Sequence, residues 1–101
     1  MYRGTTPTFR LTFPIDIASI KAAYISFSQK DLCVVEKTLD DCEIEGSRVV
    51  RLKLTQKDTL KFDEGIVKCQ ARILLKDSND AVATKIITLT IKGVLKEGVI
   101  A

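Results

Sequence analysis

The strongest pattern of hydrophobic and polar positions lies between residues 65 and 94, where two alternating segments flank a polar turn. In the first segment every second residue is apolar: Val67, Cys69, Ala71, Ile73 and Leu75. The second segment alternates apolar with polar residues in the run Ile87, Thr88, Leu89, Thr90, Ile91 and Lys92. A period of two is typical of half-buried strands. The pattern therefore predicts a hairpin whose strands join at the turn 77–80.

The second strand of this hairpin cannot keep one register along its whole length. If Ile73 and Ile87 both face the core in an unbroken ladder, Lys85 must point inward as well. A lone buried lysine is unfavourable because its charge loses its hydration. We therefore predict a β-bulge or break near residues 84–86 that resets the alternation. Val82 is expected to face inward before the break, and Ile87 after it.

Shorter segments with the same period predict further strands at residues 8–13, 20–28, 32–39, 42–45 and 48–55. The side chains expected to face inward are Phe9, Leu11, Phe13, Ala23, Ile25, Phe27, Cys33, Val35, Val50, Leu52 and Leu54. The strand 20–28 carries apolar residues on both faces, which indicates a central strand with Ala22 and Tyr24 facing outward. The segment 42–45 is expected to be a short edge strand with acidic side chains.

One helical turn is expected after residue 55, because Thr55 followed three positions later by Asp58 is typical of a helix N-terminus. Together these segments predict an all-β protein: an immunoglobulin-like antiparallel β-sandwich of six or seven strands with at most one short helical turn. A small five-stranded barrel is the alternative. The 101 residues are expected to form a single domain, 1–101.

Composition and charge narrow the class of protein without naming a function. Hydrophobic residues make up 46% of the chain and charged residues 29%, a balance typical of folded domains. The net charge of +3 comes from Lys and Arg residues scattered along the strands, which favours a solvated surface over a polyanion site. No apolar run is long enough for a membrane span, so we expect a protein made in the cytoplasm with no membrane partner.

The residues that usually carry catalysis are scarce, and we expect no enzyme, no cofactor and no metal site. The chain has no histidine, so neither the common general base nor a Ser-His or Cys-His pair can form. Glu43 and Glu45 are expected on one exposed face, whereas glycosidase-type chemistry needs two carboxylates across a cleft. The segment 77–80 offers oxygen ligands for calcium, but its residues are also those that an ordinary turn prefers. The sequence therefore singles out no catalytic, cofactor-binding or metal-binding residue.

The three cysteines, Cys33, Cys42 and Cys69, have no C-x-x-C spacing. They are expected to be free, buried or partly buried thiols that act as small apolar side chains. A disulfide between Cys33 and Cys42 would require that they face each other across neighbouring strands, and a cytosolic setting argues against it.

A recognition module that binds nucleic acid or carbohydrate is the alternative class of function. Nucleic-acid-binding barrels stack bases on aromatic side chains that share a face with Lys and Arg. Here the phenylalanines fall on the apolar phase, and only Tyr2 and Tyr24 are exceptions, so nucleic-acid binding is not expected. A carbohydrate platform is hard to build from two tyrosines and no tryptophan.

The order of the segments carries a family resemblance. It begins with Arg3-Gly4-Thr5-Thr6 and the strand from Phe9 to Phe13, and it continues through residues 17–27, 49–54 and 65–91. This order resembles the N-terminal immunoglobulin-like domain of phage baseplate upper proteins, which are tail proteins of Gram-positive phages and prophages. Thr5 stands where that family typically has aspartate, and a baseplate protein continues into further domains.

The resemblance implies a non-catalytic structural protein of a phage or prophage tail or baseplate. Its faces or edges would dock onto other virion or prophage proteins, and it would form a homo-oligomer. It would be cytoplasmic when synthesised and later part of the virion. Ala22, Tyr24 and Leu74 fall on the outward phase; they either form an apolar patch for a partner or cover a neighbouring strand.

Overall fold

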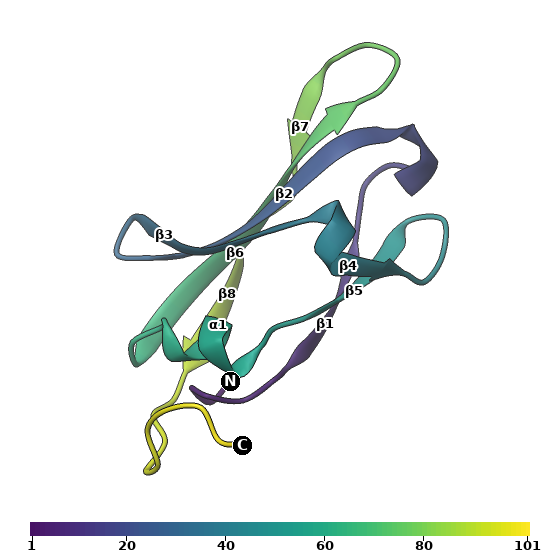
Figure 1. Cartoon of the computed structure of the whole chain (residues 1–101). Helices are drawn as coiled ribbons and strands as arrows, with labels where there is room; N and C mark the ends of the chain where they lie inside the picture. The colour runs from purple at the N-terminus through teal and green to yellow at the C-terminus, as the bar shows by residue number, and fades with distance from the viewer.

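The computed structural model describes residues 1–101 and contains eight strands in two antiparallel sheets (Figure 1). One sheet has the order β1 (Thr8–Thr12), β5 (Val49–Lys53) and β4 (Cys42–Ile44). The other has the order β3 (Leu32–Thr38), β2 (Ile20–Gln29) and β6 (Gly65–Leu75), with β7 (Ala81–Ala83) and β8 (Ile87–Ile91) both along the far edge of β6. The short helices are the 3-10 turns η1 (Ile17–Ser19) and η2 (Leu39–Asp41), and α1 (Gln56–Leu60). None of them combines the length and the apolar character needed to cross a membrane.

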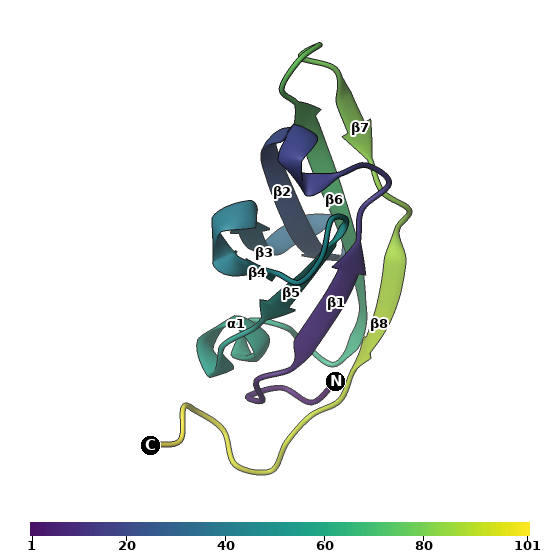
Figure 2. The same ribbon diagram turned by 90° about the vertical axis from the view of Figure 1, so that its right-hand side faces the viewer.

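The two sheets form the two layers of a sandwich (Figure 2), so the predicted all-β antiparallel architecture is confirmed. There are eight strands because the last predicted strand is divided into β7 and β8. The hairpin partners β2 and β3 belong to one sheet, whereas the second and third strands of an immunoglobulin domain lie in different sheets. The chain therefore shares the two-layer sandwich architecture of immunoglobulin domains, but its strands follow a different order within the sheets.

The core consists of the inward residues of both sheets, as the alternation predicts. Val50, Leu52 and Leu54 are fully buried on the side of the three-stranded sheet. Ile25 and Phe27 of β2 and the alternate residues of β6 meet them from the other sheet. Because β2 pairs with both β3 and β6, the prediction that it is a central strand is confirmed.

The predicted break in the last strand is present as a β-bulge. Ala83 pairs with Arg72, and the next paired residue, Ile87, lies opposite Cys69, so three residues of one strand face two of β6. Lys85 falls in the bulge and is exposed. Val82 packs against the core before the bulge. After the bulge, Ile87 lies opposite the buried Cys69, but it is 49% exposed and is not part of the core, so the prediction that Ile87 faces the core is not confirmed.

Thr84 completes the ladder at this bulge with both its backbone and its side chain. Its backbone N–H donates to the carbonyl of Ala71 at 2.9 Å, and its Oγ1 accepts from the N–H of Ala71 at 3.0 Å.

We expect Thr84→Val, which keeps the shape of the side chain, to lower the free energy of unfolding by about 1–2 kcal/mol, since the N–H of buried Ala71 loses its acceptor. Urea denaturation measures this. The matched change Thr88→Val, at an exposed position of β8, should stay within about 0.5 kcal/mol; equal effects would contradict this role for Thr84.

One inward assignment is wrong: Cys33 is exposed, while Val35 is buried. The register between β2 and β3 shifts at Phe27 and Ser28, because Phe27 pairs with Val35 and Ser28 with Cys33. Val34 is the extra residue, and it puts Cys33 out of phase with Val35. The sequence alternation through this strand is irregular and does not locate the shift.

The two ends of the chain are joined around α1 (Figure 1). Met1–Arg3 runs parallel to the end of β8, with Tyr2 opposite Lys92. The Arg3 guanidinium donates to the carbonyls of Phe62 at 2.6 Å and Leu60 at 3.0 Å, and it pairs with Glu97 at 2.6 Å. Gly4 follows with a φ of +75°, and a Cβ there would lie 3.3 Å from the side chain of Leu60. The Arg3-Gly4 pair of the sequence thus fastens the N-terminus to the end of α1.

Candidate interaction site

The outer face of the five-stranded sheet leaves an apolar patch uncovered. Ala22 of β2 pairs with Leu74 of β6, which pairs with Ala81 of β7, so these three side chains form a row across three strands. Tyr24 stands in the next row with its side chain 50% exposed. We call Ala22, Tyr24, Leu74 and Ala81 the outer patch. Tyr24 and Ala81 are exposed, whereas Ala22 and Leu74 are half-buried.

Two opposite charges flank the outer patch. Glu36 of β3 and Arg72 of β6 line the same hollow as Tyr24, a depression of about 420 Å³. Both side chains are exposed, and neither takes part in an ion pair or a side-chain hydrogen bond within the chain. The sequence alternation predicts which residues face outward here. It does not predict that a carboxylate and a guanidinium lie on opposite sides of Tyr24, because that requires the pairing of three strands.

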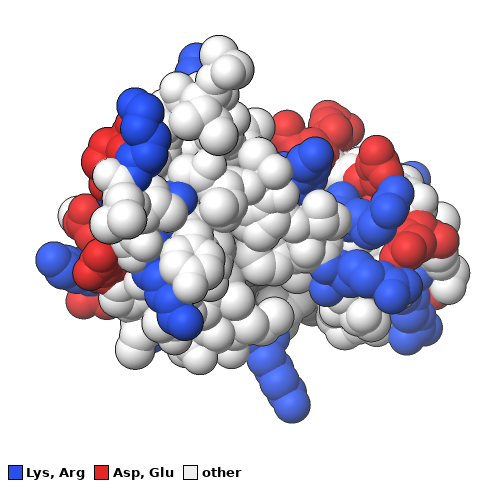
Figure 3. Space-filling model, turned by 90° about the horizontal axis from the view of Figure 1, so that it is seen from below, with Lys and Arg blue, Asp and Glu red and all other residues white.

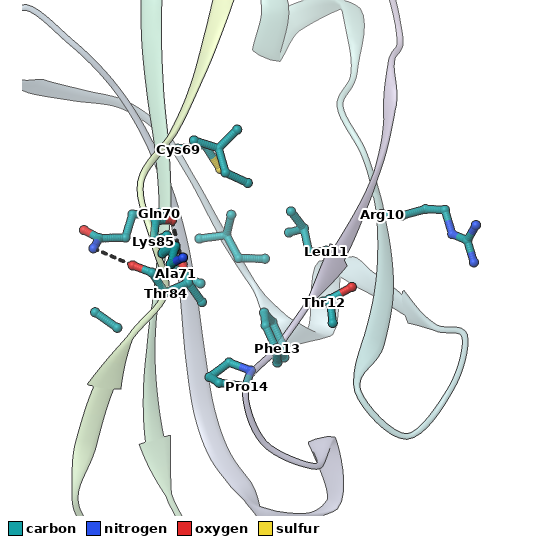
Figure 4. A pocket seen from close by; sticks show the side chains of 13 residues that line it. Arg10, Leu11, Thr12, Phe13, Pro14, Cys69, Gln70, Ala71, Thr84 and Lys85 are labelled. Atoms are coloured by element: carbon teal, nitrogen blue, oxygen red, sulfur yellow. Dashed lines mark hydrogen bonds between the residues drawn. The ribbon is translucent and has the colours of Figure 1, made fainter.

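A second concave site, the edge groove, lies between β1 and the bulge that separates β7 from β8 (Figure 4). Its volume is about 540 Å³. Leu11 of β1 and Phe13, just after β1, reach into it, while the side chain of Arg10 points away (Figure 4). Arg10 instead pairs with Glu45 at 2.8 Å. Gln70 closes one wall by donating to the carbonyl of Thr84 at 2.8 Å.

The edge groove is lined mainly by apolar side chains and contains few groups that could take part in a reaction. Burial raises the pKa of the Cys69 thiol, one of its lining residues, to about 11, so the thiol is neutral near pH 7 and is a poor nucleophile. The groove also contains no carboxylate that could pair with Lys85 as acid and base. Its lining is suited to apolar contacts rather than to a reaction.

The acidic residues singled out in the sequence are engaged in surface ion pairs. Glu43 pairs with Arg51 on the neighbouring strand β5, and Glu45 with Arg10. Both glutamates sit on or beside the edge strand β4, as the prediction of an acidic edge requires. In the segment 77–80, Asn79 adopts a positive φ of 57° and Ser78 Oγ accepts from the N–H of Asp80 at 3.2 Å, which is ordinary turn chemistry. No group of three or more Cys, Asp or Glu residues is placed to hold a metal ion.

The buried ion pair of the molecule was not anticipated from the sequence. Asp58 of α1 forms the capping box with Thr55, as expected, but its carboxylate also accepts from Lys37 Nζ of β3 at 3.0 Å. Burial alone would raise the pKa of Asp58, but the hydrogen bonds from Thr55 and Lys37 outweigh burial and lower it. This contact ties α1 to the end of β3, so its role is structural.

Lysine and arginine do not gather on the end of the molecule that carries α1 and both termini. Figure 3 shows positive and negative side chains mixed on two flanks of this end, with a largely uncharged zone between them. A polyanion site would require a continuous basic surface. This view therefore gives no support to a nucleic-acid site at that end.

All three cysteines are free, and they differ in burial: Cys33 is exposed, Cys42 is half-buried and Cys69 is buried. Burial, with a smaller contribution from neighbouring Asp41, raises the pKa of the Cys42 thiol to about 11, and burial raises that of Cys69 to about 11. We expect a thiol reagent at pH 8 to label exposed Cys33 first, and Cys42 and Cys69 about 100-fold more slowly than ordinary thiols, because the reactive thiolate is correspondingly rarer. Dithionitrobenzoate absorbance measures this. The variant Cys33→Ser should lose the fast phase; if it survives, the assignment is wrong.

Comparisons with known proteins returned no match: no family model, no curated protein and no solved structure is significantly similar to this chain. The resemblance to phage baseplate upper proteins therefore stays a prediction.

Proposed function

We propose that this chain is a non-catalytic structural module that acts through protein–protein assembly, as part of a phage or prophage tail or baseplate. The observation that carries the assembly role is the outer patch: a half-exposed tyrosine beside three apolar side chains on an uncovered sheet face. Contiguous apolar surface with polar neighbours is typical of protein interaction sites. The virion setting follows from the resemblance of the segment order to baseplate upper proteins.

The shape of the molecule favours the same role. Its Cα atoms extend over 48 × 28 × 15 Å, so it is a flat body with two broad faces. A standard interface buries about 800 Å² per partner, and a face of these dimensions can supply that area. Tyr24 of the outer patch and Arg72 beside it are of the residue types that are enriched among those that dominate binding energy.

Co-expression with the products of its flanking genes tests this function. We expect those genes to encode tail components and at least one product to co-purify with the chain in a fixed ratio through gel filtration. Tyr24→Lys should abolish the complex, because it places a charge at the centre of an apolar contact, while the surface change Lys53→Glu on β5 should leave it intact. Recovery of the chain alone in every combination would contradict the proposal.

Nucleic-acid binding is the second candidate, since Tyr24 and Arg72 share the outer face and Tyr24 pairs with Arg72 in the sheet. A single aromatic beside one cation gives a small stacking platform compared with those of single-strand binders. A titration with single-stranded oligonucleotide at low and high salt distinguishes the two functions. Affinity that falls steeply with salt would favour the nucleic-acid function over assembly.

A further inference from the structure

The outer side of β1 forms no hydrogen bond with another segment, because β1 is an edge strand of the three-stranded sheet and pairs with β5 alone. At the two ends of this ladder, the carbonyl of Pro7 and the N–H of Phe13 bond to residues that flank β5, at 3.0 and 2.8 Å. Antiparallel ladders bond at alternate residues, so the odd-numbered residues of β1 face β5. The backbone groups that point away from β5, with no partner in the chain, belong to Thr8, Arg10 and Thr12.

The other edges of the two sheets are short, irregular or partly covered, whereas β1 is open and regular. The strands β4 and β7 have three residues each, and β3 contains the register shift at Val34. Met1–Arg3 covers the end of β8. Natural proteins protect sheet edges by these means, because an open edge is a template for another strand. β1 has five residues in one unbroken register and no glycine or proline, so it is the edge best able to accept a strand.

The edge groove lies beside the open side of β1 and presents an apolar surface there (Figure 4). Leu11 of β1 is half-buried, and Ile87 of β8 is 49% exposed although it lies opposite the buried Cys69. The side chains of a strand alternate between its two faces. A strand paired with β1 would therefore turn every second side chain toward the groove, where apolar side chains would cover Leu11 and Ile87.

The N-terminal segment of the chain already binds the edge of β8 in this manner. The ammonium group of Met1 donates to the carbonyl of Thr90 at 2.9 Å, and the carbonyl of Met1 accepts from the N–H of Lys92 at 2.7 Å. The N–H of Arg3 then donates to the carbonyl of Lys92 at 2.9 Å. The edge groove lies further along the same strand, beside Ile87. On this side of the sandwich one extended segment is thus in place, and the position next to it is open.

We propose that the edge groove receives an extended segment of a partner protein, which pairs with the open side of β1 as a fourth strand of the three-stranded sheet. Alternate side chains of this segment are apolar and pack against Leu11 and Ile87. Main-chain hydrogen bonds supply the affinity in this mode of binding, and side-chain contacts supply the specificity. The inference goes beyond the proposed function, because the edge groove and the outer patch are separate surfaces.

The charge beside the groove indicates which kind of segment fits. Lys85 lines the groove without an ion-pair partner, and no carboxylate is among the lining residues. An acidic side chain on the added segment would complement it. The β1 strand of a second copy has no acidic residue and would bring Arg10 instead. A partner segment that combines apolar and acidic side chains is therefore the better match.

A peptide titration of the isotope-labelled full chain, followed by its amide resonances, tests the added strand. The probe is a capped heptapeptide in which valine alternates with threonine and the central threonine is replaced by glutamate. At millimolar concentration it should shift the amide resonances of Thr8, Arg10 and Thr12 and slow their hydrogen exchange, while those of β4 stay unchanged. The same peptide with every backbone nitrogen methylated keeps the side chains but has no N–H donors. It should bind at least about tenfold more weakly.

Two substitutions at one position separate the backbone from the side chain. Arg10→Pro removes an outward N–H of β1 and leaves the ladder with β5 intact, so it should raise the peptide Kd at least about tenfold. Arg10→Ala is the matched control: it loses the same guanidinium and its pair with Glu45 but keeps the N–H, and its Kd should stay within about threefold. Lys85→Glu should raise the Kd about fivefold or more. Circular dichroism should show that each variant is folded; if Arg10→Pro is not, the methylated peptide decides.

The outcomes that would overturn the added strand are distinct from those that bear on the proposed function. Absence of shifts on β1 at millimolar peptide would overturn it, because backbone pairing requires no particular sequence. Equal binding of the methylated peptide would do the same, since apolar contact alone would then explain the affinity. Protection of β1 that appears when the chain alone is concentrated would identify a second copy as the occupant and overturn the partner segment. Tyr24→Lys alters the outer patch and should leave the peptide Kd unchanged, so the two proposals fail independently.

Discussion

Phe27→Ala should lower the free energy of unfolding by about 3–5 kcal/mol, the largest effect expected of any single substitution in this chain. Phe27 is 1% exposed, and its ring lies 6.0 Å from the rings of both Phe9 and Phe62. These three side chains come from β2, β1 and the segment after α1, so Phe27 joins both layers and the helix. Alanine would leave a cavity that the surrounding strands cannot close, because their ladders hold the backbone in place.

Urea denaturation with a fluorescence or circular dichroism readout measures this loss. Phe27→Leu keeps most of the apolar volume and should lose roughly half as much as alanine. Phe9→Ala, at a partly buried position on β1, should also lower the free energy of unfolding by less than Phe27→Ala does. If Phe9→Ala destabilises the protein as much as Phe27→Ala does, the three rings are not organised around Phe27.

The second large effect is expected at Asp58, where Asp58→Ala should lower the free energy of unfolding by about 3 kcal/mol at pH 7. The substitution removes the acceptor of the Thr55 N–H at 2.9 Å and leaves Lys37, whose side chain is 20% exposed, without its counter-ion. Asp41 is the matched control: it makes the same capping box with Thr38 at η2, but it is exposed and has no lysine partner. Asp41→Ala should cost about 1 kcal/mol.

The effect of Asp58 should depend on pH in a direction set by its lowered pKa. The folded state holds the proton of this carboxyl less tightly than the unfolded state does, so ionised Asp58 stabilises the fold at every pH above the ordinary carboxyl range. That contribution is lost as the pH falls through the lowered folded-state pKa. The difference in stability between the original chain and Asp58→Ala should therefore narrow below about pH 4. A difference that stays constant between pH 7 and pH 3 would contradict the ionic role of Asp58.

The elements that follow from local chemistry were predictable from the sequence. The alternation of apolar and polar residues located the buried faces of β5 and β6. An unbroken ladder would have turned Lys85 into the core, and this located the bulge, because a one-residue register shift changes which side chains face inward. Thr55 and Asp58 marked the start of α1. The outward positions of Tyr24, Ala22 and Leu74 came from the same periodicity, so part of the candidate site was visible in the chain.

The parts that depend on contacts between distant segments were not predictable. The shift that exposes Cys33 is set by how β3 pairs with β2, and no residue nearby signals it. Lys37, near the end of β3, meets Asp58 in the first turn of α1, although the two residues are 21 positions apart in the sequence. The placement of Glu36 and Arg72 on either side of Tyr24 likewise requires the strand order β3–β2–β6.

The parallel contact between Met1–Arg3 and the end of β8 has a mechanical consequence. The N-terminal segment and β8 run in the same direction, with bonds from Lys92 to Met1 and from Arg3 to Lys92. A force that draws the two termini apart along the strand direction slides one segment against the other. The hydrogen bonds between them are then loaded together in shear rather than opened one after another, so they resist this pull jointly.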